Sequence, residues 1–240
     1  MLRLLALALL FITAPLACGT TPVLARGLEA GAAPTGAVIA ERGDYRGRAA
    51  LRIRKRAGAD GPCCLVALPG APFRNGTIEA WVAGAPVEGA SEGARGFIGL
   101  AFRMQADGRY EAFYIRPTNG RADDQFRRNH STQYISEPDF PWQRLRQESP
   151  GVYESYADMV AGEWIRLRIE VEGARARLYL GNAPQPVLIV NDLKLGADAS
   201  GGIGLWVEQE TDAHFADVRV TRRDAATSPA QTSPRRSGRP

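Results

Sequence analysis

The sequence predicts an all-β protein, built as a two-sheet antiparallel jelly-roll sandwich. Short runs of alternating apolar and polar residues recur from about residue 49 to residue 223, strong turn signals separate them, and no stretch has the period of an amphipathic helix. A sheet that is apolar on one face must bury that face against another layer. About ten such strands in one chain therefore favour two packed sheets.

Two hairpins are the clearest predicted elements. The run RGFIGLAFRMQ, residues 95–105, leads into residues 106–117 through Asp107-Gly108, a pair typical of tight hairpin turns. The run EWIRLRIEVEGARARLYLGN, residues 163–182, turns at Glu172-Gly173. Its apolar residues alternate with arginines and glutamates, which predicts an antiparallel sheet with one side exposed to solvent.

Further strands are expected on both sides of these hairpins. Residues 76–84, GTIEAWVAG, place Ile78, Ala80 and Val82 on one face, with Glu79 and Trp81 opposite. Cys63 and Cys64 are adjacent, and disulfide geometry disfavours a bond between neighbours, so we expect two strand residues, at least one of them buried. The other candidate strands are residues 49–56, 63–68, 186–193, 201–210 and 214–223.

The chain is expected to hold a single domain, residues 37–223. Residues 1–25 join a basic residue to an apolar run, the pattern of a signal peptide cleaved before Arg26, with a lipid anchor on Cys18 as the alternative. Residues 26–36 are expected to be a flexible leader, and residues 224–240 a disordered Ser/Pro/Arg tail. We therefore expect an exported bacterial protein, periplasmic or extracellular, with no membrane insertion after signal removal.

The charge of the predicted domain is nearly balanced. The whole chain carries a formal charge of +4, but residues 26–223 hold 26 basic and 25 acidic groups. Nucleic-acid binding needs a basic stripe, and none is seen here. Nucleic acid is therefore not expected as a partner.

The last part of the chain carries a family likeness. GGIGLWVEQETDAHFADVRV, residues 201–220, resembles the closing strands of concanavalin A-like lectin/glucanase domains, which include laminin-G-like modules and the bacterial domains called 3-keto-disaccharide hydrolase. Residues 76–84 and 162–182 resemble an early strand and the central hairpin of the same domains. The resemblance implies a jelly roll whose concave face and rim loops hold carbohydrate. The Glu-x-Asp-x-x-Glu signature of family 16 glycoside hydrolases is not found, which puts a retaining glucanase in doubt.

The stretch IRPTNGRADDQFRRNHSTQYISEPDFPWQRL, residues 115–145, interrupts the strand pattern. It is rich in Arg, Asp, Asn and aromatic residues, and a long loop of this kind is typically functional. Polar groups of these types can bind sugar hydroxyls, and aromatic faces can cover the C–H surface of a sugar ring. The candidate ligand-binding residues, in this 116–145 loop and on outer sheet faces, are Trp81, Tyr114, Arg116, Asn119, Asp123, Asp124, Arg127, His130, Tyr134 and Trp142.

The first functional expectation is therefore carbohydrate binding on the concave face and the 116–145 loop. An alternative is a hydrolase of a glycoside or modified disaccharide, with an acid or base among Glu79, Asp123, Asp124 and His130. A second alternative is a protein-interaction module, and the sequence does not decide whether the chain is an enzyme.

No cofactor is expected. Glu208, Glu210 and Asp212 alternate beside Trp206 and offer the oxygen ligands that calcium favours. Solvated charges at a strand edge explain them better.

Overall fold

The computed structural model describes residues 38–56, 58–59 and 63–223. The predicted signal peptide, the leader, Cys18 and the tail of residues 224–240 lie outside the described residues, so those expectations stay predictions. Of the predicted domain of residues 37–223, residues 37, 57 and 60–62 also lie outside the described residues.

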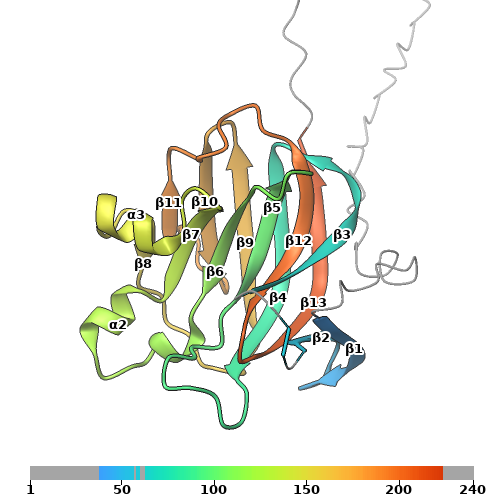
Figure 1. Cartoon of the computed structure of the whole chain (residues 1–240), viewed down its shortest axis with the longest axis vertical. Helices are drawn as coiled ribbons and strands as arrows, with labels where there is room; N and C mark the ends of the chain where they lie inside the picture. Colours follow the sequence, from blue (N-terminus) through green and yellow to red (C-terminus); the bar gives the residue numbers. More distant parts are fainter. Residues whose placement is uncertain (1–37, 57, 60–62, 224–240) are drawn as a thin grey trace, which may run out of the picture.

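Two antiparallel sheets pack face to face (Figure 1). This arrangement confirms the predicted all-β sandwich. One sheet has seven strands in the order β1 (Val38–Tyr45), β2 (Arg48–Lys55), β13 (Thr211–Arg222), β4 (Gly76–Pro86), β9 (Ile165–Glu172), β10 (Arg175–Leu180) and β11 (Leu188–Val190). The other has six, in the order β3 (Cys63–Phe73), β12 (Gly201–Glu208), β5 (Ile98–Met104), β6 (Tyr110–Ile115), β7 (Thr132–Glu137) and β8 (Glu154–Ser155).

Both predicted hairpins are present. β5 pairs with β6, and Gly108 takes the positive φ of 89° that the turn requires. β9 pairs with β10 around Gly173, whose φ is 57°. Cys63 and Cys64 are the first residues of β3, which confirms the strand part of their prediction.

The core lies between the inner faces of the two sheets. Ile78, Ala80 and Val82 of β4 are buried there, which confirms the predicted face of this strand. From the six-stranded sheet, Leu100 and Phe113 face them as a cross-strand pair. Along β4 and β9, the alternation seen in the sequence therefore sets which side of the strand is apolar and buried.

The 116–145 region contains more regular structure than the sequence predicted. It holds a 3₁₀ turn, η1 (Pro117–Asn119), two short helices, α2 (Gln125–Asn129) and α3 (Trp142–Glu148), and the strand β7. The expectations of an irregular loop and of no helix are therefore wrong. The sequence pattern did not predict β7, because both of its faces are buried. Its buried polar residues Thr132, Gln133 and Ser136 interrupt the alternation of apolar and polar residues.

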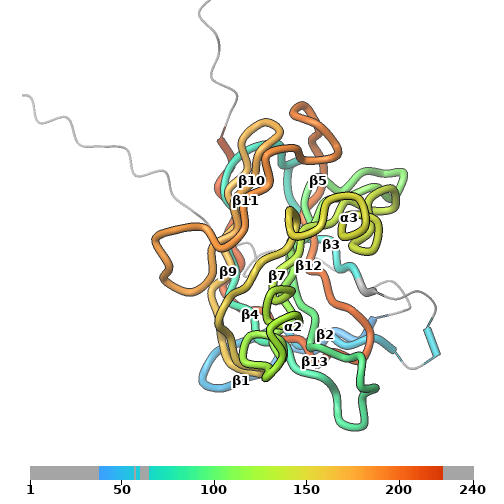
Figure 2. Tube along the Cα trace, turned by 90° about the vertical axis from the view of Figure 1, so that its left-hand side faces the viewer, coloured from blue at the N-terminus to red at the C-terminus, as the bar shows by residue number. Residues whose placement is uncertain are grey.

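The two helices lie at the β7–β8 edge of the six-stranded sheet (Figures 1 and 2). Each is short, so packing and capping rather than amphipathic periodicity hold it. The Asp124 side chain caps α2 by accepting from the Arg127 backbone N–H at 3.1 Å, and Leu145 anchors α3 as its buried residue. No helix in the described part of the chain has the length and apolar character to cross a membrane.

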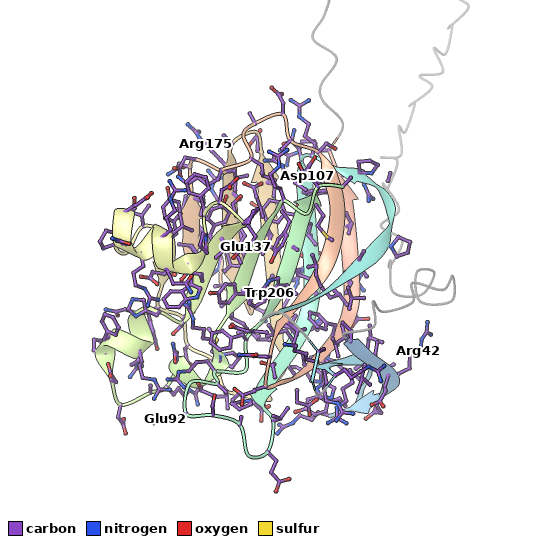
Figure 3. The ribbon with its side chains drawn as sticks, in the orientation of Figure 1. Arg42, Glu92, Asp107, Glu137, Arg175 and Trp206 are labelled. Atoms are coloured by element: carbon purple, nitrogen blue, oxygen red, sulfur yellow. The ribbon has the colours of Figure 1, made fainter. Side chains whose placement is uncertain are left out.

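One end of the sandwich is closed by the buried side chain of Arg103. The register between β5 and β12 shifts beside this residue, which has a φ of 51°, a conformation that non-glycine residues rarely adopt. Its guanidinium donates to the carbonyls of Arg74, Gly173 and Gly196 at 2.7–3.2 Å and to the Glu111 carboxylate at 3.3 Å. Arg103 thus joins three connecting segments at the end of the molecule where Figure 3 labels Asp107 and Arg175.

Glu111 completes this buried network. One of its carboxylate oxygens accepts from the Tyr134 hydroxyl at 2.7 Å and from the Leu195 backbone N–H at 3.2 Å. Burial raises the pKa of Glu111 and lowers the pKa of Arg103, as expected for charges removed from water. The charged form of each residue is therefore stabilised by its hydrogen-bond and ion-pair partners.

We predict that Arg103→Met lowers the free energy of unfolding by about 3–5 kcal/mol, because it leaves the Glu111 carboxylate buried without its counter-charge. Urea denaturation followed by circular dichroism measures this change. The matched control is Arg109→Met, which removes an exposed arginine paired with an exposed aspartate, and should cost about 1 kcal/mol or less. Equal losses in the two variants would contradict the structural role of Arg103.

Candidate functional site

A pocket of about 390 Å³ opens at the other end of the six-stranded sheet, where β12 ends and β5 begins. Its walls come from the loop before β5, the region between β6 and β7, helix α3 and the turn after β12. In Figure 3 the labelled Trp206 lies above this end of the sheet, and the labelled Glu92 lies on the loop below it. The pocket is thus remote from the Arg103 end.

An aromatic stack supports the pocket from the sheet side. The rings of Tyr114 and Trp206 stack with their centroids 4.4 Å apart and their planes within 16°. Gly99, on the strand between them, makes room, because a Cβ at this position would lie 2.6 Å from the Cβ of Tyr114. Tyr114 is buried, and burial raises the pKa of its hydroxyl. Tyr114 was predicted to contact the ligand, and the structure places it in the layer beneath instead.

Arg116 lies on this stack and lines the pocket. Its guanidinium is buried and donates to the His130 carbonyl at 3.0 Å, to the Tyr114 hydroxyl at 2.9 Å and to the Gln133 side-chain carbonyl at 3.1 Å. All of these acceptors are neutral. Arg116 therefore fixes the chain that follows β6, and it has no ion-pair partner among the described residues.

Trp142, the first residue of α3, forms one wall. The guanidinium groups of Arg116 and Arg146 lie 6.0 and 4.7 Å from its ring centroid. Arg146 is itself held by the buried carboxylate of Glu154, at 2.7 Å. These contacts hold the indole beside the pocket before any ligand arrives.

His130 was a candidate acid or base, and it does line the pocket. Its Nδ1 is hydrogen-bonded to the Phe126 carbonyl, and its Nε2 lies 3.0 Å from the Glu154 carboxylate. Both ring nitrogens are thus engaged with oxygen atoms of the protein. His130 is a structural link between α2 and β8 in this arrangement and has no free nitrogen to offer a substrate.

Arg95 and Arg127 form the cationic side of the pocket. Arg95 donates to the backbone carbonyls of Ala94 and Glu92. Its pKa is lowered, first by burial and then by the nearby charge of Arg127; the charge of Glu92 opposes this effect, and that of Arg116 adds to it. Among the described residues, the guanidinium of Arg127 has no hydrogen bond or ion pair, and its Nε is buried without a partner.

The pocket's acidic residues are Glu208 and Glu210. Burial raises the pKa of Glu208, an effect that the charge of Arg116 partly offsets. Both carboxylate oxygens of Glu210 accept from Ser91, from its backbone N–H at 3.0 Å and its hydroxyl at 2.6 Å, and these bonds lower the pKa of Glu210. Of the two acidic residues, Glu208 is therefore the one whose carboxylate accepts no hydrogen bond from a described side chain.

The expectation that Glu208, Glu210 and Asp212 share one strand face is wrong. β12 ends at Glu208, and Glu210 occupies the turn with a φ of 58°. Asp212 belongs to β13 in the other sheet, where it forms a bidentate pair with Arg52 at 2.6 and 2.8 Å. The residues described here contain no group of three or more His, Cys, Asp or Glu side chains that could hold a metal ion.

Several predicted site residues lie away from the pocket. Glu79 and Trp81 are on the outer face of β4, in the opposite sheet, where they contact Arg166 and Arg48 respectively. The expectation that they share a binding surface with the 116–145 region is therefore wrong.

Tyr134 points into the core and is 0% exposed, bound to Glu111, so it is not available to stack on a ligand. Asp123 and Asp124 are exposed and do not line the pocket, and Asp124 serves as the α2 cap.

The structure brings together five of the predicted residues: Arg116, Asn119, Arg127, His130 and Trp142. It adds residues that the sequence reasoning missed, namely Arg95, Phe97, Phe126 and Arg146. Arg146 lies one residue beyond the stretch that was singled out, and Phe126 lies within it. Arg95 and Phe97 had no local signal, because only the sheet order β12-β5-β6 places them beside Arg116.

Comparisons with known proteins find likenesses of fold. No family model matches the chain, and no curated protein matches it. Among solved structures, the chain is similar to the carbohydrate binding module CBM66 from Bacillus subtilis, with a TM-score of 0.49 and 17% identity over 78% of this chain and 95% of that one.

Two further likenesses are of the same kind. The Caenorhabditis elegans galectin LEC-6 gives a TM-score of 0.39 and 12% identity, over 68% of this chain and 93% of that one. A glycosyl hydrolase family 16 protein from Mycobacterium smegmatis gives a TM-score of 0.41 and 17% identity, over 79% of this chain and 94% of that one. At these scores and identities no function is carried over to this chain, and the sandwich fold is established by its own two sheets.

Proposed function

We propose that this protein binds a saccharide in the pocket between Arg116 and Trp142. The observation that carries the proposal is that aromatic faces and polar groups with unused hydrogen-bonding capacity line the same cavity. Saccharides present hydroxyl groups around a ring whose C–H surface is apolar, so a site for them needs both kinds of group. The pocket volume of about 390 Å³ falls within the range typical of small-ligand sites.

The polar capacity comes from three side chains. Asn119 donates to the His130 carbonyl at 3.1 Å, but its buried Oδ1 has no partner. The buried Nε of Arg127 is also unpaired, and the Glu208 carboxylate accepts no hydrogen bond from the described side chains. Buried polar atoms without partners are costly in a folded protein. A ligand that supplies hydroxyl groups would satisfy them.

The apolar surface comes from Trp142, Phe97 and Phe126, which all line the pocket. Phe126 is 66% exposed, although its ring also packs edge-to-face against the His130 ring, with the two ring centroids 4.2 Å apart. Large exposed aromatic side chains beside a cavity are typical of binding sites. Trp142 is the strongest candidate to stack on a sugar ring, since two arginines already hold its indole in place.

Binding is favoured over hydrolysis by the state of the two acids. A glycosidase uses a pair of carboxyl groups. Among the described residues that line the pocket, Glu210 is bound through both oxygens to Ser91, which leaves Glu208 alone to act as acid or base. Export remains part of the proposal, because an exported protein would meet saccharides outside the cell.

We predict that Trp142→Ala weakens saccharide binding by about thirtyfold, because truncating a central aromatic anchor typically costs about 2 kcal/mol. An array of oligosaccharides identifies a ligand, and calorimetry of residues 26–223 measures its affinity. The matched control is Trp81→Ala, which removes an equivalent side chain from the opposite sheet and should leave the affinity unchanged. A loss of affinity in the Trp81 variant, with binding retained in the Trp142 variant, would place the site on the seven-stranded sheet and contradict the proposal.

A second prediction concerns Glu208 and pH. The pKa of Glu208 is raised by burial, so the folded protein holds this proton more tightly than the unfolded chain does. The resulting stabilisation is complete below the unfolded pKa, about 4.3, and is lost as the pH rises through the folded pKa. Glu208→Gln removes the ionisation, so the wild type should be more stable relative to this variant at pH 4 than at pH 7.

Urea denaturation of both proteins at the two pH values measures this difference. Glu88→Gln, at an exposed glutamate in the loop before β5, controls for the loss of one surface carboxylate. A stability difference between wild type and Glu208→Gln that is the same at both pH values would show that the half-buried Glu208 does not have a raised pKa in the folded protein.

A further inference from the structure

The charge distribution of the pocket narrows the class of saccharide. Four arginines line it, Arg95, Arg116, Arg127 and Arg146, against the two glutamates. Only one of these arginines is neutralised by an ion pair within the described part of the chain: Arg146 lies 2.7 Å from the carboxylate of Glu154. The other three guanidinium groups come from three separate segments and converge without a bound carboxylate.

The partners of these three groups are neutral or missing. Arg116 donates to a carbonyl, a hydroxyl and an amide oxygen, and Arg95 donates to two backbone carbonyls. Arg127 has no side-chain partner among the described residues, and its buried Nε is unsatisfied. Like charges so placed repel each other, which agrees with the lowered pKa of Arg95. A cluster of this kind is stabilised by any anion that enters it.

The pocket's glutamates do not fill this role. Glu210 is held at the rim by Ser91, through hydrogen bonds to both of its oxygens. Glu208 faces Arg116 and forms no salt bridge with any of the described arginines. On the side of the pocket lined by Arg95 and Arg127, the nearby charge of Glu92 offsets part of the repulsion at Arg95, but neither arginine forms an ion pair with a described residue.

We infer that the saccharide carries an acidic group, a carboxylate or a sulfate ester, and that Arg127 binds it with the help of Arg95. This inference rests on the proposed function, since it names the substrate class of the same pocket. The planar guanidinium group presents paired N–H donors that match two oxygens of a carboxylate or sulfate. Arg116, whose two Nη atoms already donate to three acceptors, acts as a positioning residue that adds charge.

The test compares matched acidic and neutral saccharides. An oligosaccharide of uronic acids is titrated beside its methyl ester, and a sulfated oligosaccharide beside its desulfated form, by calorimetry at low and high salt. We expect the wild type to bind at least one acidic form about tenfold or more tightly than its neutral partner. The preferred pair tells whether the acid is a carboxylate or a sulfate, and the preference should shrink as salt rises.

Three variants connect the preference to the pocket. Arg127→Gln should abolish it, and Arg127→Lys, which keeps the charge but loses the paired donors, should reduce it. Arg219→Gln removes the same charge from an exposed position on β13, in the other sheet, and should leave it intact. Thermal unfolding of each variant checks that the fold is retained, which we expect because the Arg127 guanidinium forms no bond with the described residues.

The outcomes separate this inference from the proposed function. Equal binding of acidic and neutral forms, abolished by Trp142→Ala, would overturn the acidic-group inference and leave the saccharide site standing. A preference for acid that survives Arg127→Gln would also overturn it. Binding of inorganic sulfate that Arg127→Gln abolishes, with no binding of any saccharide, would overturn the proposed function and the saccharide part of this inference together.

Discussion

The arrangement of the site depends on the buried guanidinium of Arg116. Taking this charge out of water is costly, and the chain offsets the cost with three neutral acceptors from β6, β7 and the segment between them. Those bonds fix the path of the 116–145 region across the end of the sheet. The positions of Asn119, His130 and Trp142 follow from that path. The same guanidinium supplies a positive charge that no described carboxylate neutralises.

The opposite end of the six-stranded sheet uses an arginine in a different way. Arg103 is also buried, but its acceptors include a carboxylate, and its remaining donors close three connecting segments. At one end of the sandwich, hydrogen bonds of Arg103 therefore hold the connecting segments together. The other end holds a pocket with unsatisfied donors and acceptors. The structural role of Arg103 and the proposed binding role of the pocket differ in whether the hydrogen-bonding capacity is complete.

The fold could be predicted from local pattern, and the site only in part. Alternation along Ile165–Glu172 and the Asp107-Gly108 turn identify strands and hairpins, because burial on one face is visible in the residues themselves. β7 was missed because its polar residues are satisfied by tertiary hydrogen bonds, for example from Gln133 to the Tyr153 carbonyl at 3.1 Å. Arg95 and Phe97 join the site through the order of the strands, which local sequence does not encode.

Composition singled out the 116–145 region, which contributes several residues to the pocket, but it could not distinguish pocket residues from core residues there. Tyr134 and Tyr114 have the same chemistry as ligand-contacting aromatics, yet one is bound to Glu111 in the core and the other lies under Arg116. Trp81 has the same chemistry in sequence as Trp142, but Trp81 lies on β4 of the seven-stranded sheet and Trp142 opens helix α3 beside the pocket. Which face of which sheet a residue occupies decides its role, and that requires the assembled fold.

The most direct test is a crystal structure of the protein with an oligosaccharide that it binds. We expect a sugar ring against Trp142, with its polar groups on Asn119, Arg127 and Glu208. Density for the sugar on the outer face of the seven-stranded sheet, near Trp81, with the Arg116 pocket empty, would contradict this expectation.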